Sequence, residues 1–335
     1  MFEFSVVSGA VIRDLLKSQP RLALQSVQAA YLAHHQGLTV NPDSYFLRFA
    51  DESANRIIAL PASLAGDIKV AGIKWISSFP SNIQSGIPRA SAALILNDQQ
   101  TGYPFACLEA SLLSAARTAA SAVLGAYWCN RQSRRAKRLS FIGAGIIARN
   151  IFETFIADGW HFDRVGVHDT YRDYSVAFQQ QILQTSDLPA FIDTQLEEAL
   201  EADIVVFATN GSTPYVRADW RFEPHQVVLH ISLRDLAPET ILASENIFDD
   251  VEHCLKASTS PHLAEQLSGN REFVSGTLAE LILGELKLPD DRARIFSPFG
   301  MGILDLALGK ALYDQAVQNG TAVRIQNFFG ETRRW

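Results

Sequence analysis

The chain has 335 residues, of which 47% are hydrophobic and 19% charged, the balance of a folded globular protein with room for two domains. Its net charge of -7 provides no general attraction to nucleic acid or to an anionic membrane. The three cysteines lie far apart and form no CxxC motif. This spacing argues against a disulfide framework and against a zinc site, and we expect no bound metal.

The apolar segments bear on where the protein resides. The longest apolar run, Ala119–Cys129, is too short to span a bilayer. The first residues, Met1–Phe4, lack the basic and then apolar order of a secretory signal. We therefore expect a cytoplasmic protein.

The first third of the chain has the pattern of an α+β domain. Residues 11–35 carry apolar positions at helical spacing that Pro20 interrupts, which predicts two helices. Short strand-like runs follow, and a turn at 98–102 predicts a hairpin. The runs are 45–49, 56–60, 68–76, 91–97 and 104–108. The Ala- and Ser-rich residues 111–128 predict a closely packed helix that leads into the next domain.

The middle of the chain alternates between strand and helix patterns. Residues 139–149 form an apolar strand, a Gly-x-Gly-x-x-Ala turn and a helix, the context of a dinucleotide-binding fingerprint. Further predicted strands are 164–169, 204–209, 227–231 and 247–248, and predicted helices are 146–157, 171–184 and, after a Thr194/Glu197 capping box, 195–202. The alternation predicts a Rossmann domain with a parallel sheet. The basic residues 131–138 just before it are interpreted as a solvated helix end.

The glycine turn predicts where a dinucleotide binds. Gly143 permits the tight turn, Gly145 lets backbone approach a pyrophosphate, and the phosphates lie at the helix N-terminus. Asp169 ends the next strand, where it would hold a ribose diol; its charge favours NAD over NADP, although Arg172 is near. The expected cofactor residues here are Gly143, Ala144, Gly145, Ile146, Ile147 and Asp169. A sharp βα turn without any ligand is the alternative.

Other strand ends of a parallel sheet gather at the same edge, where ligands collect. We expect Thr209, Asn210 and Ser232 to contact the cofactor, and Asp235 to act as a general base toward an amine or a water. Asp235 could instead only shape the turn before Pro238. Gly300 lies in a loop that could close over a nicotinamide ring or simply cross between domains. His230 is interpreted as a packed core histidine.

Basic residues stand beside apolar neighbours in the first domain. They are Arg48, Lys74, Arg89 and Arg117. Apolar surroundings predict that these cations point inward and need anionic partners, such as the carboxylates of a substrate. The alternatives are internal ion pairs with Asp or Glu, or half-exposed strands.

The motifs together resemble the ornithine cyclodeaminase/μ-crystallin family, in that family's order and over nearly the whole chain. They are 72–74, 98–104, 116–120, 143–145, 202–205 and 300–305. The resemblance implies a homodimer. It also implies a substrate-binding and dimerisation domain, residues 1–116 with 306–335, and a Rossmann NAD-binding domain, residues 117–305. The implied fold class is α/β, a Rossmann dinucleotide-binding domain plus an α+β domain.

Within the family, residues 73–80, 89–92 and 230–235 are most similar to dehydrogenases that cleave N-(2-amino-2-carboxyethyl)-L-glutamate for 2,3-diaminopropionate synthesis, which serves siderophores and peptide antibiotics. The resemblance implies that Arg48, Lys74 and Arg117 hold the substrate and that Asp235, with Lys74, is catalytic. Residues 232–234 replace a glycine-rich segment of typical cyclodeaminases, and Arg234 and Arg89 become further anion partners. An ornithine cyclodeaminase, a ketimine reductase and a non-catalytic NAD(P)-binding protein are the alternatives.

Overall fold

The computed structural model describes residues 2–50 and 52–333. These residues form two compact units. Unit 1 comprises the described residues up to Arg117 together with those from Met301 onward, and unit 2 comprises Thr118–Gly300. Each unit is built around its own sheet, and α3 (Ser111–Cys129) runs from the first unit into the second.

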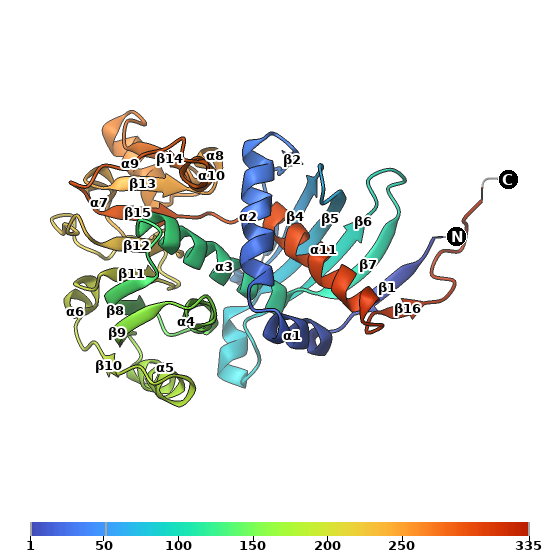
Figure 1. Ribbon diagram of the computed structural model, residues 1–335, viewed down its shortest axis with the longest axis horizontal. Coiled ribbons are helices and arrows are strands. Elements are labelled where there is room, and N and C mark those ends of the chain that lie inside the picture. Colours follow the sequence, from blue (N-terminus) through green and yellow to red (C-terminus); the bar gives the residue numbers. More distant parts are fainter. Residues whose placement is uncertain (1, 51, 334–335) are drawn as a thin grey trace. The chain divides into compact units, whose positions relative to one another are not determined.

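Unit 1 is a mixed sheet covered by helices (Figure 1). Its strand order is β16-β1-β7-β6-β5-β4-β2, with β3 paired to β4. Among the described strands of this sheet, β1 and β7 pair in parallel and the other pairs are antiparallel. The elements are β1 (Phe4–Val7), α1 (Gly9–Ser18), α2 (Leu22–His35), β2 (Thr39–Val40), β3 (Tyr45–Phe49), β4 (Glu52–Leu64), β5 (Val70–Ser78), the 3-10 helix η1 (Pro80–Ser85), β6 (Ala90–Asn97), β7 (Pro104–Glu109), α11 (Gly302–Gln318) and β16 (Val323–Ile325). The two helices before residue 36 and the β6–β7 hairpin are confirmed.

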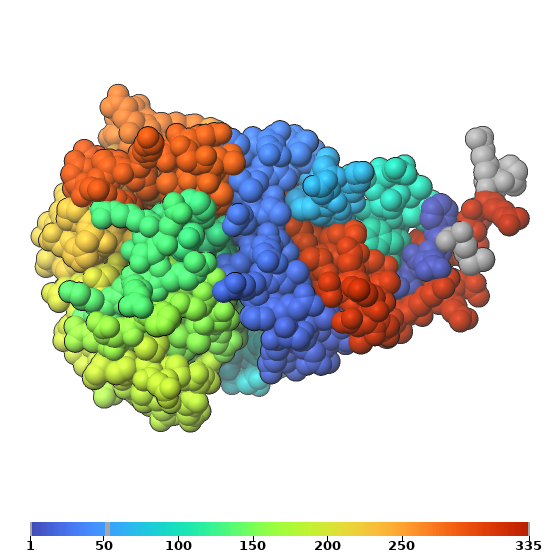
Figure 2. All heavy atoms as spheres, viewed as in Figure 1, coloured from blue at the N-terminus to red at the C-terminus, as the bar shows by residue number. Residues whose placement is uncertain are grey.

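One face of this sheet packs against helix α11. Side chains alternate along a strand, and on β5 the residues Val70, Lys74 and Ser78 are buried while Trp75 on the other face is exposed. Helix α11 lies over the buried face, with α2 beside it (Figures 1 and 2). The approach is close, because a Cβ at Gly309 of α11 would lie 2.2 Å from a methyl group of Leu94 on β6.

The limits of the units differ slightly from those predicted. The contacts divide the chain at 117/118 and 300/301, where the sequence predicts 116/117 and 305/306. The second difference has a local cause, because residues 302–305 are the first turn of α11. Gly302 lies against the Leu60 carbonyl and Ala62 of β4, so this turn belongs to unit 1.

Unit 2 is a doubly wound parallel sheet of order β10-β9-β8-β11-β12-β15-β13-β14, and all its strand pairs are parallel. Its elements are β8 (Arg135–Ile142), α4 (Ile146–Ala157), β9 (His161–His168), α5 (Arg172–Thr185), β10 (Ala190–Ile192), α6 (Leu196–Leu200), β11 (Ile204–Phe207), β12 (Val227–His230), α7 (Pro238–Leu242), β13 (Glu245–Phe248), α8 (Val251–Cys254), α9 (Ser260–Ser268), β14 (Val274–Thr277), α10 (Leu278–Leu283) and β15 (Arg294–Ser297). The predicted Rossmann fold and the α/β class are confirmed.

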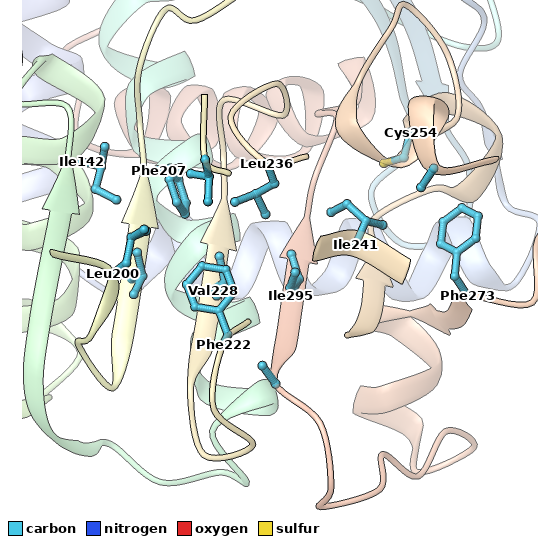
Figure 3. Packing of buried hydrophobic residues seen from close by; sticks show 14 of the residues in the cluster. Ile142, Leu200, Phe207, Phe222, Val228, Leu236, Ile241, Cys254, Phe273 and Ile295 are labelled. Carbon is cyan, nitrogen blue, oxygen red and sulfur yellow. The ribbon is translucent and has the colours of Figure 1, made fainter. Parts of the chain in front are cut away.

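The core of unit 2 explains the apolar runs of its sequence. Every residue of β11 and β12 is buried, as expected for parallel strands covered on both faces. Figure 3 shows Phe207, Val228 and Ile295 from neighbouring strands in one cluster with Leu236 and Ile241. The sheet is therefore a rigid base for the loops at its strand ends.

Two local predictions are wrong. Residues 135–138 are not a helix end but the first half of β8, with exposed and half-buried residues in alternation; there Arg138 pairs with Asp193 at 2.5 Å. The capping box lies one residue later than predicted, at Gln195 and Glu198. Glu198 accepts hydrogen bonds from the backbone N–H groups of Thr194 and Gln195, so it caps α6 through two residues at once.

Among residues 2–50 and 52–333, no helix combines the length and the apolar character needed to cross a membrane.

Candidate functional site

The glycine turn after β8 is fixed by its neighbours. The backbone N–H of Gly143 donates to the His168 carbonyl at 2.8 Å, and that of Ala208 donates to the Ile142 carbonyl at 2.9 Å. Gly143 has φ +96°, and a Cβ there would lie 2.4 Å from the Ala208 carbonyl oxygen, so only glycine fits.

Gly145 has a different reason for being a glycine. It is the N-cap of α4, and a Cβ at Gly145 would meet no atom within 4 Å. Packing within the protein therefore does not require a glycine here. A backbone face left open at the start of a 12-residue helix is what a phosphate group needs, so the residues present fit a dinucleotide. Ile146 beside it is exposed and Ile147 half-buried.

Asp169 is tied to this turn. One carboxylate oxygen accepts a hydrogen bond from the Ala144 backbone N–H at 2.9 Å, and the other accepts one from the Tyr171 N–H at 2.9 Å. Asp169, predicted to bind the ribose, and the glycine turn, predicted to bind the phosphates, thus lie side by side at the ends of β9 and β8.

Asp235 is the centre of a second cluster. It is fully buried, and its Oδ1 accepts from the Thr209 hydroxyl at 2.6 Å and from the Tyr215 hydroxyl at 2.8 Å. Its Oδ2 accepts from the Ser232 hydroxyl at 2.5 Å and lies 3.2 Å from His230 Nε2. Each carboxylate oxygen has two lone pairs, so the four partners occupy all the acceptor positions of Asp235.

These partners decide the charge of Asp235. Burial alone would raise the pKa of this carboxyl, but His230, Ser232 and Thr209 stabilise the carboxylate and lower the pKa to about 2. Burial and the neighbouring Asp235 charge raise the pKa of Tyr215. At neutral pH the cluster therefore holds a carboxylate and a phenol. Asp235 is ionised and could accept a proton from water only if one of its partners moved away.

The sequence foresaw part of this cluster. His230 is a packed core histidine, as predicted, and its ring lies edge-on to Phe207. Thr209 and Ser232, predicted to contact the cofactor, both donate hydrogen bonds to the Asp235 carboxylate. Tyr215 was missed, because it lies in the irregular segment between β11 and β12 and belongs to no motif.

The loop at the end of unit 2 is held by another buried acid. Asp249 accepts hydrogen bonds from the backbone N–H groups of Phe299 at 2.9 Å and of Gly300 at 2.8 Å. Gly300 has φ +88°. Asn210 is exposed, and Arg234 donates to the Ala257 carbonyl at 2.7 Å. The roles predicted for Gly300, Asn210 and Arg234 remain predictions.

Lys74 and Arg117 form a buried cluster in unit 1. Lys74 Nζ lies 2.6 Å from one Asp305 oxygen, and Arg117 Nε lies 3.2 Å from the other. Lys74 also donates to the Ser114 hydroxyl at 3.1 Å. The alternative of an internal ion pair therefore holds for both residues. Two cations share one carboxylate, however, so the cluster retains an excess positive charge when Lys74 is protonated.

The environment of Lys74 changes its acidity. Burial lowers the pKa of Lys74 to about 8, helped by the Arg117 charge and opposed by Asp305. Near neutral pH Lys74 can therefore give up or take a proton, a property that suits a catalytic group.

Arg48 and Arg89 lie elsewhere on unit 1. Arg48 lies in β3, whose residues are all exposed, so the prediction that its charge is buried is wrong. It stands directly opposite Arg56 of β4, a residue that no motif singled out. Arg89 is half-buried, and burial together with the Arg56 charge lowers its pKa. The predicted substrate cations thus fall into two groups.

Comparison with known proteins identifies the family. The sequence profile of the ornithine cyclodeaminase/mu-crystallin family matches residues 10–320. The chain belongs to this family. It is 30% identical over 314 residues to the N-((2S)-2-amino-2-carboxyethyl)-L-glutamate dehydrogenase of Staphylococcus aureus, covering 90% of this chain and 93% of that protein. It is 28% identical to a Delta(1)-pyrroline-2-carboxylate reductase of Bacillus thuringiensis subsp. konkukian, over 86% of this chain and 90% of that protein.

The solved structures agree on the fold. An archaeal alanine dehydrogenase, described as a dimer with bound NAD, superposes with a TM-score of 0.85 at 24% identity, over 98% of this chain and 100% of that chain. At 24% identity, this similarity establishes the fold.

Lys74 should make the stability of this family member depend on pH. Its pKa is about 8 in the folded protein and 10.5 ordinarily, so between these values the unfolded chain binds a proton that the folded protein lacks. The free energy of unfolding should therefore rise with pH, by about 2 kcal/mol from about pH 7.5 to 9.5 through this group. Urea unfolding of the wild type and of Lys74→Met measures this contribution as the difference between the two curves.

Lys310→Met is the matched control, because Lys310 lies on α11 in a partly exposed pair with Asp314. This variant should keep the wild-type pH dependence. Parallel curves for the wild type and Lys74→Met would contradict the assignment of the low pKa to Lys74.

Proposed function

We propose that the protein catalyses the NAD-dependent oxidative cleavage of N-(2-amino-2-carboxyethyl)-L-glutamate to 2-oxoglutarate and L-2,3-diaminopropionate, a precursor of siderophores or peptide antibiotics. The observation that carries the proposal is the 30% identity to the Staphylococcus aureus dehydrogenase over 90% of the chain. The excess of cations over carboxylates at Lys74 and Arg117 supports a substrate that carries a carboxylate.

The coarser assignment is an NAD-dependent oxidoreductase acting on amino acids or their imines. The two curated relatives are a dehydrogenase and a reductase of this kind, and the solved archaeal relative holds NAD. In this chain, the turn at Gly143–Ile147 and Asp169 would hold the dinucleotide, with Thr209, Asn210, Ser232 and Gly300 near its nicotinamide end. Bound NAD supplies a hydride acceptor; the protein supplies binding, orientation and charge.

Unit 1 supplies the groups that we assign to substrate binding. The spare positive charge of the Lys74–Arg117–Asp305 cluster attracts a carboxylate, and the Arg117 guanidinium can bind it through two parallel hydrogen bonds. Fixing the carboxylate orients the adjacent Cα–H bond, and orientation of this kind lowers a barrier by several kcal/mol, roughly 7 to 11 in ideal cases.

The remaining chemistry is hydrolysis. Loss of hydride from the glutamyl Cα turns the secondary amine into an imine, and addition of water then separates 2-oxoglutarate from diaminopropionate. Two groups are assigned to the proton transfers. Lys74, with its pKa near 8, can exchange protons at neutral pH. Asp235 is assigned the role of proton acceptor for the water. Its Oδ1 accepts a hydrogen bond from Tyr215, which is 40% exposed, and displacement of this phenol would free that oxygen to accept a proton.

The outer face of the unit 1 sheet is the surface that we propose for a homodimer. It is the face without α11, and it exposes apolar side chains from successive strands, including Val6, Trp75 and Ile95. Contiguous exposed apolar side chains favour association with another protein surface. The dimeric archaeal relative supports a second copy as the partner.

An imine reductase is the second candidate. The chain matches a Delta(1)-pyrroline-2-carboxylate reductase at 28% identity, and reduction of an imino acid runs the same hydride step in the opposite direction. Ornithine cyclodeamination has less support, because Ser232-Leu233-Arg234 stand where typical cyclodeaminases carry glycines.

A single set of incubations separates these functions. Purified protein is mixed with NAD and N-(2-amino-2-carboxyethyl)-L-glutamate, and we expect equal amounts of NADH, 2-oxoglutarate and 2,3-diaminopropionate, measured by absorbance and amino-acid analysis. Proline from ornithine without net NADH would replace the proposal by a cyclodeaminase. Oxidation of NADH with pyrroline-2-carboxylate alone would favour the reductase, and tight NAD binding without any turnover would favour a non-catalytic protein.

Exchange of Asp169 for Ser should relax the choice of cofactor. The Asp169 carboxylate repels a 2′-phosphate by its charge and can accept a hydrogen bond from a ribose hydroxyl. We expect NAD to bind about tenfold more weakly to Asp169→Ser and NADP more tightly. Fluorescence titration with both reduced dinucleotides measures this. Asp163→Ser, an exposed acid on the same strand, is the control, and an unchanged NAD affinity of Asp169→Ser would refute the assignment.

Asp235→Asn should remove turnover while NAD still binds. The amide replaces one carboxylate oxygen by a donor that would face the Ser232 hydroxyl and His230, and the negative charge is lost. We expect kcat to fall by about a hundredfold or more. Asp219→Asn, at an exposed acid paired with Arg217, should behave as wild type. Retained activity in a folded Asp235→Asn protein would exclude a catalytic role.

A further inference from the structure

The Asp235 carboxylate is fully occupied by its four hydrogen-bond partners. A water molecule therefore cannot bind to it without displacing one of them, yet hydrolysis of an imine requires that the attacking water lose a proton. Either a partner moves aside, or a partner carries the proton itself. Three of the partners are hydroxyl groups, and a hydroxyl group can donate one proton while it accepts another.

Tyr215 is the exposed member of these three hydroxyl-bearing partners. Thr209 and Ser232 are half-buried, and the Thr209 hydroxyl already accepts a hydrogen bond from the Gly211 N–H at 3.2 Å. The Tyr215 hydroxyl donates its proton to Asp235 Oδ1 at 2.8 Å, and the lone pairs of the phenolic oxygen can accept a hydrogen bond from water. The phenol therefore connects the buried carboxylate with the exterior of the cluster.

Several contacts hold Tyr215 in place. The backbone N–H groups of Tyr215 and Val216 both donate to the Asp235 carbonyl at 3.0 Å. Val216 also forms a parallel bridge with Leu236. A Cβ added at Gly211 would lie 3.3 Å from the Tyr215 ring, so the ring lies close against the backbone there. The segment that carries the phenol is thus tied to the turn that carries the acid, which favours proton transfer through Tyr215 over its displacement.

The acidities of the two groups favour a concerted transfer. Burial and the Asp235 charge raise the pKa of Tyr215, so a free phenolate is unfavourable and the phenolic proton leaves only as another proton arrives. The pKa of Asp235 is about 2, so this carboxyl group gives up an accepted proton readily. The pair therefore suits a proton that is taken from water and given back within one reaction.

We propose that Tyr215 is a catalytic residue, a relay that carries protons between Asp235 and the water that attacks the imine. The proposal rests on the proposed function in one respect, that a protonated imine is hydrolysed. The water oxygen bonds to the imine carbon, and the second electron pair of the C=N bond moves to nitrogen. At the same time the water proton passes to Tyr215 Oη and the phenolic proton passes to Asp235 Oδ1.

The same relay returns the proton when the addition product breaks down. The C–N bond breaks with its electron pair on nitrogen, and the proton on Asp235 passes back through Tyr215 to that nitrogen. The proton of the new hydroxyl group passes to solvent as the carbonyl of 2-oxoglutarate forms. Tyr215 is a neutral phenol before and after each transfer.

Single-turnover kinetics separate hydride transfer from hydrolysis. The full-length protein is mixed with NAD and N-(2-amino-2-carboxyethyl)-L-glutamate, and NADH absorbance reports hydride transfer. Samples are quenched with borohydride, which reduces unhydrolysed imine back to the amine, so free 2,3-diaminopropionate reports hydrolysis. We expect Tyr215→Phe to form NADH at the wild-type rate and 2,3-diaminopropionate about tenfold or more slowly, because an acid–base group is lost. Tyr174→Phe, at an exposed tyrosine of α5, should match the wild type in both rates.

Displacement of Tyr215 predicts the opposite result. Phenylalanine would leave Asp235 Oδ1 open to water, so hydrolysis would keep or exceed its wild-type rate, and that outcome overturns the relay. Slower hydrolysis in Ser232→Ala but not in Tyr215→Phe overturns it as well. Should Tyr215→Phe not fold, hydrolysis by the wild type in mixtures of H2O and D2O decides. Two protons move together in the relay, so the rate should fall along a curve as deuterium increases, and a straight line overturns the relay.

Failure of the proposed function has a different signature. If the wild type forms no NADH from this substrate, the function fails, and the relay that serves it fails too. If the wild type forms NADH and 2,3-diaminopropionate at rates that Tyr215→Phe shares, the function stands and the relay fails.

Discussion

Buried carboxylates fix the positions of the groups that carry the chemistry in each unit. A charge in a protein interior is tolerated only when its hydrogen-bonding capacity is met. Asp305 meets this condition with Lys74 and Arg117, and Asp235 meets it with three hydroxyl groups and His230. Because each acid draws its partners from different elements, it sets their geometry more firmly than the loops alone could.

The clusters around the two acids differ in which group can exchange a proton near neutral pH. Asp305 faces two cations that also repel each other, and burial leaves the Lys74 pKa at about 8. Asp235 faces donors that stabilise its charge, and its pKa falls to about 2. Both pKa values thus lie below their ordinary values, that of Lys74 because of burial and that of Asp235 because of its hydrogen-bond partners. In the resting arrangement Lys74 is thus the better proton-transfer group, and Asp235 is the better fixed charge.

The sequence predicted the elements better than the pairings. The strand, turn and helix around Gly143 depend on residues close in the chain, and the position of Asp169 beside the turn follows from the spacing that the fold imposes. The partners of Lys74 and Asp235 depend on contacts between distant residues: 231 positions separate Lys74 from Asp305, and no local pattern reports such a contact.

The same reasoning explains which residues were missed. Arg56 gains its meaning only from the register that places it opposite Arg48. Strand β15 was missed because it opens on a charged residue, Arg294, which is buried and paired with Asp290. The first turn of α11 was assigned to the other domain because the family resemblance placed the limit at residue 305. In each case a tertiary contact overrode the local signal.

Leu233 shows how the departure from the family's glycines can be accommodated. Its φ of 68° is left-handed, which costs a residue with a side chain roughly 1–2 kcal/mol. The side chain is only 6% exposed, and burying a leucine contributes about 1.5–3 kcal/mol, enough to offset the strain. The Leu233 carbonyl also accepts a hydrogen bond from Ser260 at 2.7 Å. A glycine would adopt this turn without strain, but it would have no side chain to bury. The buried Leu233 side chain therefore fixes the positions of Ser232 and Asp235 relative to each other more firmly than a glycine segment would.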